Sequence, residues 1–221
     1  MQAADDPQHR PLPADLGRIL HDLRGPLNSL TMHLEVLKRI ARGDAAAEDS
    51  LRTSLQQLAR LAEMLPAAFA VTALELGPLR PLDLGALATR VRDAEGASAV
   101  TIAPDGWPSV AGDETLLALA LTHLVRNAIE ATAAGAHAPV ITGAMSGDTA
   151  LVHVRDWGPG LRTTNPKLLF KLMQSTKPGH RGVGLVTVER ISRLHGGELR
   201  FESVGDGAVV TLALPALGSH V

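Results

Sequence analysis

Apolar residues near the start of the chain form two runs with helical spacing. In each run they lie alternately four and three residues apart, which is the heptad pattern of a helix that packs along one face. The first run is Leu16, Leu20, Leu23, Leu27, Leu30, Leu34, Leu37 and Ala41, and the second is Leu51, Leu55, Leu58, Ala62, Leu65, Phe69, Thr72 and Leu76. Between them Gly43 suits a helix C-cap, and Asp44 or Asp49 suits the next N-cap. The pattern predicts an antiparallel α-hairpin.

A single hairpin of this kind leaves much apolar surface exposed. Pairing two hairpins into a four-helix bundle would bury that surface, so we predict a homodimer formed through residues 14–77. Residues 1–13 contain three prolines and charges of both signs, and we expect them to be a flexible lead-in. Residues 77–84 (GPLRPLDL) suggest a linker between the hairpin and the rest of the chain.

The pattern changes after the linker, where short apolar runs alternate with helical periodicity. Residues 82–216 therefore form a second predicted domain, an α/β sandwich in which helices cover a mixed sheet. We expect helices at 84–94, 112–135, 166–173 and 182–197 and a strand at 97–104. Two β-hairpins complete the set, one at 139–157 turning at 146–148 and one at 198–215 turning at 205–207.

Composition excludes several classes of function. The 221 residues carry a net charge of −2, which gives no electrostatic case for a nucleic-acid partner. The absence of cysteine excludes disulfides, thiolate catalysis and cysteine-ligated zinc. No apolar run approaches the roughly 20 residues that span a bilayer, and the N-terminus has no signal-peptide pattern. We therefore expect a cytoplasmic protein, and one whose sensor, if it has one, is a separate protein.

Two motifs in the second domain carry ligand chemistry. Asn127 lies on a predicted helix, and its amide oxygen is a hard donor of the kind that Mg²⁺ accepts beside water and phosphate oxygens. Asp156 ends a predicted strand just before Gly158 and Gly160, so its carboxylate can accept a hydrogen bond from the exocyclic amine of adenine. The two glycines would let the ring approach the backbone closely.

A third motif follows in the order expected of a nucleotide pocket. Gly182 and Gly184 open a predicted helix, whose free amides and positive dipole end favour phosphate. Lys177 and Arg181 stand nearby and would add positive charge. Each motif is weak alone, but the three in this order predict a site for a nucleotide whose phosphates bind Mg²⁺.

These residues give the chain a resemblance over 16–215 to two-component sensor histidine kinases. NAIEAT (127–132) resembles the family's N box, DWGPGL (156–161) and RGVGL (181–185) its two glycine boxes, and LLFKLMQSTKP (168–178) its lid. The resemblance implies the GHKL (Bergerat) ATP-binding fold shared with gyrase B, the Hsp90 chaperones and MutL. It also implies that Asn127 binds Mg²⁺ and Asp156 binds adenine. The pocket and lid would be shaped by Gly158, Gly160, Gly182 and Gly184.

HDLRGPL (21–27) resembles the family's H box, which contains the phosphoacceptor histidine. His21 directly follows Leu20 and so lies off the apolar seam, and a neutral imidazole is a usable nucleophile. The resemblance implies that His21 takes the γ-phosphoryl group of ATP and passes it to an aspartate on a response-regulator receiver domain. Asp22 would polarise the imidazole by accepting a hydrogen bond from its Nδ1.

The chain departs from the family pattern at three positions. Gly25 stands where the family usually has Thr or Asn, a side chain associated with dephosphorylation of the partner, so phosphatase activity is an open question. His123 stands where most relatives have Asn and the ATP-hydrolysing cousins have a catalytic Glu. Roles as a base, as a phosphate contact or in helix packing all remain open for it. His180 replaces a frequent first glycine of the second glycine box.

Two other functions fit parts of the pattern. A non-catalytic histidine phosphotransferase or scaffold would keep the hairpin and dock a receiver domain, but take phosphate from elsewhere. A serine/threonine kinase of the anti-sigma type shares the nucleotide fold, but such kinases lack a histidine hairpin, so residues 16–76 argue against it. The stimulus, the cognate receiver, and whether His21 uses its own subunit's pocket or the partner's are not fixed by the sequence.

Overall fold

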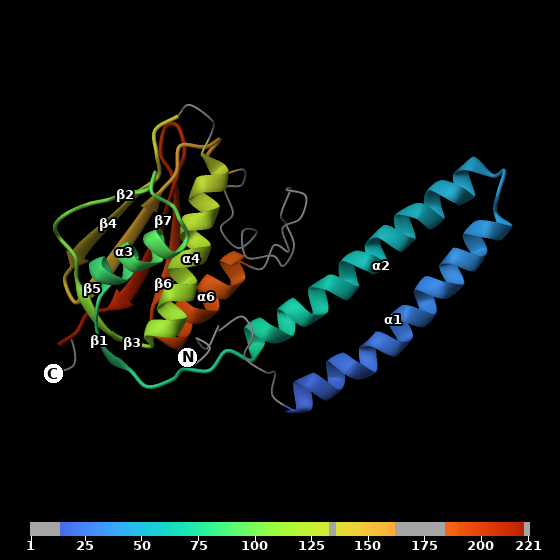
Figure 1. The fold of residues 1–221 in the computed structure, drawn as a ribbon, viewed down its shortest axis with the longest axis horizontal. Helices are drawn as coiled ribbons and strands as arrows, with labels where there is room; N and C mark the ends of the chain where they lie inside the picture. The colour runs from blue at the N-terminus through green and yellow to red at the C-terminus, as the bar shows by residue number, and fades with distance from the viewer. Residues whose placement is uncertain (1–13, 133–135, 162–183, 219–221) are drawn as a thin grey trace. The chain divides into compact units, whose positions relative to one another are not determined.

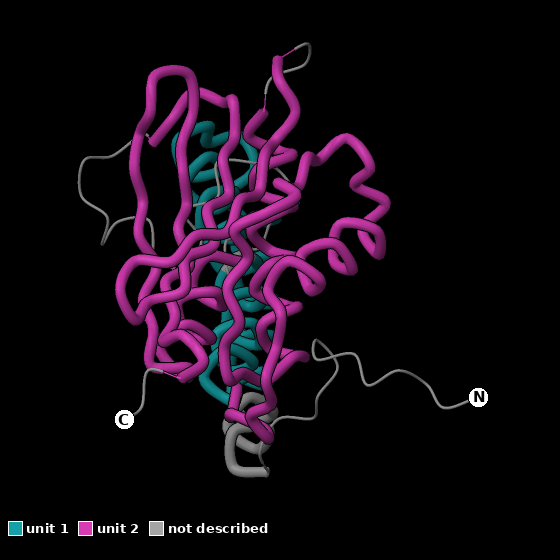
Figure 2. The backbone as a smooth tube through the Cα atoms, turned by 90° about the vertical axis from the view of Figure 1, so that its left-hand side faces the viewer, with its two compact units in different colours: residues 1–73, 175–183 teal, residues 74–174, 184–221 magenta. Residues whose placement is uncertain are grey.

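The computed structural model describes residues 14–132, 136–161 and 184–218, with side chains from Leu23 onward except that of Arg60. The chain divides into two compact units, coloured separately in Figure 2. Among the described residues, the first unit comprises 14–73 and the second comprises 74–132, 136–161 and 184–218.

The first unit is a helical hairpin, as the heptad runs predict. Helix α1 (Ala14–Ile40) and helix α2 (Ala45–Thr72) lie side by side (Figure 1). Asp44 caps α2 by accepting from the backbone N–H groups of Ala46 and Ala47 at 3.1 and 3.2 Å. Gly43 adopts a φ of +96°, which confirms the predicted turn between the helices.

Several large apolar side chains of the hairpin are exposed to solvent in the single chain. Leu30 is 53% exposed, Leu37 50% and Ile40 74%. Met32, Val36 and Leu61 are also large apolar residues with about half of their surface exposed. A patch of this kind on a helix pair is unusual for a monomer and indicates an interaction surface.

The second unit begins earlier than the heptad pattern suggests. The seam was expected to continue to Leu76, but α2 ends at Thr72 and Leu74 is buried in the core of the second unit. Two hydrogen bonds hold this segment there. Arg190 Nη2 donates to the Leu74 carbonyl at 3.3 Å, and the Gly77 N–H donates to Asp113 Oδ2 at 2.9 Å. Tertiary contacts therefore end the helix where periodicity alone would extend it.

The stretch that suggested a linker contains a strand. Strand β1 (Arg80–Asp83) pairs antiparallel with β3 (Ser109–Gly112) in a two-stranded sheet. The sequence reading missed both strands because β1 is only four residues long and contains Pro81, which lowers the apparent strand propensity.

A five-stranded sheet forms the body of the unit, in the order β2-β4-β5-β7-β6. The strands are β2 (Thr101–Ile102), β4 (Val140–Ser146), β5 (Thr149–Arg155), β6 (Glu198–Ser203) and β7 (Ala208–Pro215). Strand β2 runs parallel to β4, and the other neighbours are antiparallel. Both predicted β-hairpins are confirmed, with positive φ at Gly147 in one turn and at Gly205 and Gly207 in the other. The strand expected at 97–104 is reduced to β2.

Three helices lie against one face of this sheet (Figure 1): α3 (Leu84–Ala94), α4 (Glu114–Ala131) and α6 (Gly184–Leu194). Alternate residues of β5 point at them, so Ala150, Val152 and Val154 join the core with Leu117 and Leu124 of α4. The sequence therefore predicted the α/β sandwich correctly. The helix expected at 166–173, and the ends of two others at 135 and 182–183, fall outside the described residues. In the described part of the chain, no helix has the length and apolarity required to cross a membrane.

Candidate functional site

Asp156 follows β5 and is held by one of its two carboxylate oxygens. Its Oδ1 accepts from the backbone N–H of Gly158 at 2.9 Å and of Ala208 at 3.2 Å. Asp156 is buried, with an exposed fraction of 8%, and among the described residues no donor reaches Oδ2. The carboxylate is thus fixed in orientation with one acceptor available to a ligand, which suits recognition of an exocyclic amine.

Neighbouring backbone atoms leave no room for a side chain at Gly158 or Gly160, so glycine is needed there for packing as well as for the turn. A Cβ on Gly158 would overlap the carbonyl oxygen of Ala131, the last residue of α4. Gly160 has a φ of +72°, and a Cβ there would lie 3.1 Å from the carbonyl oxygen of Gly207. The loop therefore fits between the end of α4 and the β6–β7 turn only because both residues lack side chains.

Two further residues, which the sequence reading did not assign to the site, fasten this loop to α4. Thr132 Oγ1 donates to the Ala128 carbonyl at 2.8 Å and accepts from the Trp157 backbone N–H at 3.3 Å. The Trp157 indole N–H donates to the Ala138 carbonyl at 2.9 Å. Thr132 is the last residue of the NAIEAT motif, but its partner is distant in sequence, so no local signal could identify the contact.

Asn127 lies away from the Asp156 loop, where α4 packs against the start of α6. A Cβ on Gly184, the first residue of α6, would stand 3.9 Å from Asn127 Nδ2 and 3.4 Å from His123 Nδ1. Asn127 and His123 are four residues apart and so share one face of α4. The packing of α4 on α6 thus brings the first and third sequence motifs together.

The surroundings of His123 favour the neutral form of its imidazole. Burial lowers its pKa below the ordinary value because the imidazolium loses contact with water, and the nearby charge of Arg126 lowers the pKa further. Glu95 opposes this only in part, since it pairs with Arg126 through contacts of 2.5 and 3.0 Å. No hydrogen bond to either ring nitrogen comes from the described residues, so the unprotonated nitrogen of the neutral ring is available to a ligand.

The donor set near α6 fits a magnesium ion that keeps most of its ligands as water and phosphate oxygens. Asn127 can offer its amide oxygen to a metal, because rotation of the terminal amide by 180° exchanges the positions of Oδ1 and Nδ2. Within the described residues no group of three or more His, Cys, Asp or Glu side chains forms a metal cage. A metal at this place would therefore depend on the nucleotide for part of its coordination.

The remaining predicted site residues fall outside these contacts. His21 and Asp22 lie in the helix of α1, whose described side chains begin at Leu23. Lys177, Arg181 and Gly182 lie outside the described residues. The structure therefore places Gly184 beside Asn127 on α4 and Gly158 at the end of the same helix. Asp156 is bonded to Gly158, and Gly160 lies against the β6–β7 turn.

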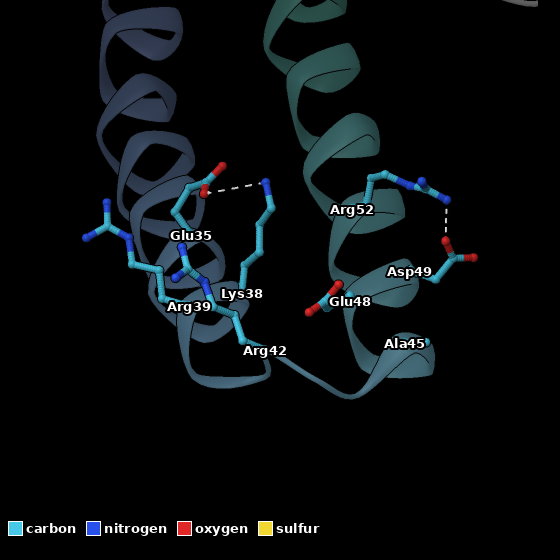
Figure 3. Close-up of a pocket in the computed structure, with 8 residues that line it drawn as sticks. All are labelled: Glu35, Lys38, Arg39, Arg42, Ala45, Glu48, Asp49 and Arg52. Carbon is cyan, nitrogen blue, oxygen red and sulfur yellow. Dashed lines mark hydrogen bonds and ion pairs between the residues drawn. The ribbon is translucent and has the colours of Figure 1, made fainter.

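A separate hollow of about 520 Å³ lies at the turn of the helical hairpin (Figure 3). Its wall is almost entirely charged, and the charges pair with one another: Lys38 lies 3.8 Å from Glu35, and Arg52 pairs with Asp49. It contains none of the motif residues, so we do not assign it to the nucleotide chemistry.

Comparison with known proteins agrees with the motifs. The model of the histidine kinase-, DNA gyrase B-, and HSP90-like ATPase family matches residues 112–218. The sensor protein BasS of Salmonella typhimurium is 30% identical over 207 residues, which is 88% of this chain and 57% of the relative. The sensor protein DivL of Caulobacter vibrioides is 30% identical over 216 residues, covering 90% of this chain and 27% of DivL. The chain thus spans little more than half of the one relative and about a quarter of the other.

Solved structures show the same fold. Full-length ShkA, crystallised in complex with AMPPNP, superposes with a TM-score of 0.59 at 23% identity, over 93% of this chain and 46% of that one. The histidine kinase AdeS of Acinetobacter baumannii gives a TM-score of 0.56 at 23% identity, over 90% of this chain and 98% of that one. These neighbours confirm the predicted GHKL-type α/β fold for the second unit.

Proposed function

This chain has the core of a two-component histidine kinase, and from that premise we propose that it binds ATP with Mg²⁺ and phosphorylates His21. The phosphoryl group then passes to an aspartate of a response-regulator receiver domain. The observation that supports this most directly is the role of α4. One end of the helix contacts the Asp156 loop through Ala131 and Thr132, while Asn127 faces Gly184 at the start of α6.

In the proposed complex, Asp156 accepts a hydrogen bond from the exocyclic amine of adenine through its unused Oδ2. Asn127 binds the metal through its amide oxygen, and the metal neutralises charge on the phosphates. Gly182 and Gly184 let the start of α6 approach the phosphate tail, with Lys177 and Arg181 as additional cations.

The proposed transfer step uses His21 as the nucleophile. The lone pair of Nε2 forms a bond to the γ-phosphorus, and the bond from that phosphorus to the β–γ bridging oxygen breaks, so that its electron pair leaves with ADP. Asp22 accepts a hydrogen bond from Nδ1–H, which selects the reactive tautomer and stabilises the positive charge on the ring. A carboxylate oxygen of the receiver then displaces the imidazole to form an acyl phosphate.

We further propose that two copies pair through the exposed apolar side of the hairpin. Leu30, Leu37 and Ile40 on α1 are each half exposed or more in the single chain, and a second hairpin would cover them. A cytoplasmic location is proposed because ATP and receiver domains are found there, and a separate sensor protein would supply the signal.

The test is incubation of the full chain with γ-labelled ATP and Mg²⁺. Wild type is expected to acquire acid-labile, base-stable label, while His21→Ala and Asn127→Ala acquire none. His33→Ala is the matched control, because His33 lies on the same helix and, among the described residues, is hydrogen-bonded only to Ser29, at 3.5 Å. Equal labelling of wild type and His21→Ala would refute the proposal.

A non-catalytic phosphotransferase would give a different result in the same assay. It would take no label from ATP but would accept phosphoryl from a phosphorylated receiver, again at His21. Calorimetric titration with ATP separates the two functions, since loss of binding in Asp156→Ala would show that the nucleotide site is used.

A further inference from the structure

His123 has no role in the function proposed so far, although it faces the same space as Asn127. Its Nδ1 lies 3.4 Å, and Asn127 Nδ2 3.9 Å, from the point where a Cβ on Gly184 would stand. The two side chains therefore converge on one place at the start of α6 (α4 and α6 in Figure 1). Gly184 leaves that place open because it has no side chain.

The imidazole of His123 is half-buried, and no hydrogen bond from a described residue fixes it. A histidine that serves only structure is normally hydrogen-bonded within the fold. His195 of the same unit illustrates the usual case: its Nε2 accepts from the Asp113 N–H at 3.0 Å and its Nδ1 lies 2.8 Å from the Ile191 carbonyl. His123 has no such partner among the described residues, and Glu95 is engaged by Arg126.

His123 and Asn127 place an imidazole and an amide four residues apart on α4. Residues at i and i+4 lie next to one another on a helix, so both can reach one ion. Imidazole nitrogen binds divalent transition ions well, whereas Mg²⁺ strongly prefers oxygen donors. Replacing an oxygen donor by nitrogen at one position should therefore change which ion binds best with the nucleotide.

We propose that His123 is a second protein ligand, beside Asn127, to the metal that binds with the nucleotide, and that the site prefers Mn²⁺ or Co²⁺ to Mg²⁺. The inference rests on the proposed nucleotide site, because phosphate oxygens and water complete the coordination. His123 thus binds the metal and does not act as a base.

Pulsed EPR on the full chain tests the contact directly. The protein is prepared with ¹⁵N-labelled histidine and loaded with Mn²⁺ and the β,γ-methylene analogue of ATP, whose phosphate bridge contains no nitrogen. Wild type is expected to show a ¹⁵N coupling to Mn²⁺, and His123→Asn to show none. Because the decisive signal comes from wild type, the test does not depend on how well the variant folds.

Calorimetric titration with the same analogue gives a second readout. In wild type the analogue should bind about tenfold more tightly with Mn²⁺ than with Mg²⁺, and in His123→Asn the two affinities should become similar, since Asn supplies an oxygen donor. Binding with neither ¹⁵N coupling nor a metal preference would overturn the role of His123 and leave the nucleotide site intact. No binding of the analogue with either metal would refute both.

Discussion

Gly207 and Asp156 touch backbone to backbone, because a Cβ on Gly207 would overlap the carbonyl oxygen of Asp156. The neighbouring residue adds two hydrogen bonds to the same contact. Asp156 N–H donates to the Ala208 carbonyl at 3.0 Å, and Ala208 N–H donates to Asp156 Oδ1 at 3.2 Å. The β6–β7 turn therefore positions the carboxylate proposed to recognise adenine.

Gly207→Ala is expected to disrupt this contact. The residue has a φ of +137°, which a side chain rarely adopts, and the added methyl group would displace the Asp156 backbone. We expect a loss of about 2–4 kcal/mol in the free energy of unfolding and a fall of at least about tenfold in ATP affinity. Chemical denaturation and calorimetric titration measure the two effects.

Gly205→Ala is the matched control for that substitution. Gly205 lies in the same turn with a φ of +47°, but nothing lies within 4 Å of its added Cβ. It should lose only about 1 kcal/mol from left-handed backbone strain and keep its ATP affinity. Equal effects of the two substitutions would show that the Asp156 contact is not the cause.

Asp113 connects the entry of the second unit to α4. Its Oδ1 caps α4 by accepting from Thr115 and Leu116, and its Oδ2 accepts from Gly77. Asp113→Ala should therefore lose about 1–2 kcal/mol for the cap and also release residues 74–79. Hydrogen exchange of the Gly77 amide should become faster by about tenfold or more.

Asp83→Ala separates capping from anchoring. Asp83 caps α3 by accepting from Ala86 at 2.8 Å and makes no bond to the entering segment. This variant should show a similar loss of stability with unchanged exchange at Gly77. Fast exchange in both variants would mean that the segment responds to global stability rather than to the Asp113 contact.

Much of the fold was predictable because its determinants are local. Heptad spacing predicted the α-hairpin, and turn glycines predicted both β-hairpins, whose turns contain Gly147 and Gly205. The order of the motifs also gave the positions of Asn127, Asp156 and Gly158 on their elements. Each of these signals is contained within a few residues.

The features that the sequence did not predict depend on contacts between distant segments. Pairing of β1 with β3 needs Pro81 to lie opposite Ala111, which no local pattern indicates. The end of α2 is set by Leu74, which is buried among residues of the second unit. The requirement for Gly207 likewise appears only when Asp156 is placed beside it.

The free energy of unfolding should depend on pH through His123. Burial lowers the pKa of this imidazole in the folded state, so the unfolded chain binds its proton more readily. The contribution of His123 to the free energy of unfolding should be constant above its unfolded-state pKa of about 6.5. It should fall as the pH drops below that pKa, by at most about 1.4 kcal/mol per pH unit. Denaturation of wild type and His123→Asn between pH 5 and 8 measures the difference, and parallel curves would contradict the expectation.

Ser192 on α6 is a site where loss of a polar group should stabilise the protein. Its side chain is fully buried, and its hydroxyl has no hydrogen-bond partner among the described residues. Ser192→Ala removes the unpaired hydroxyl and improves helix propensity, so we expect a gain of about 1 kcal/mol by thermal denaturation. Ser192→Val, which adds bulk at the same position, should lose stability, and destabilisation by Ala would indicate that the hydroxyl is satisfied in solution.

Gly25 offers a test of the missing phosphatase side chain. An added Cβ at this position of α1 meets no atom within 4 Å, so Gly25→Thr can be made without a clash in the hairpin. We expect wild type to dephosphorylate a receiver domain only slowly and Gly25→Thr to do so about tenfold faster or more, because the hydroxyl can orient water.

Gly25→Ala supplies the control, since it strengthens the helix by about 1 kcal/mol without adding a hydroxyl. The receiver domain that accepts label most rapidly serves as the substrate, and the release of inorganic phosphate from it measures the rate. Equal rate increases in Gly25→Ala and Gly25→Thr would attribute the effect to helix stability.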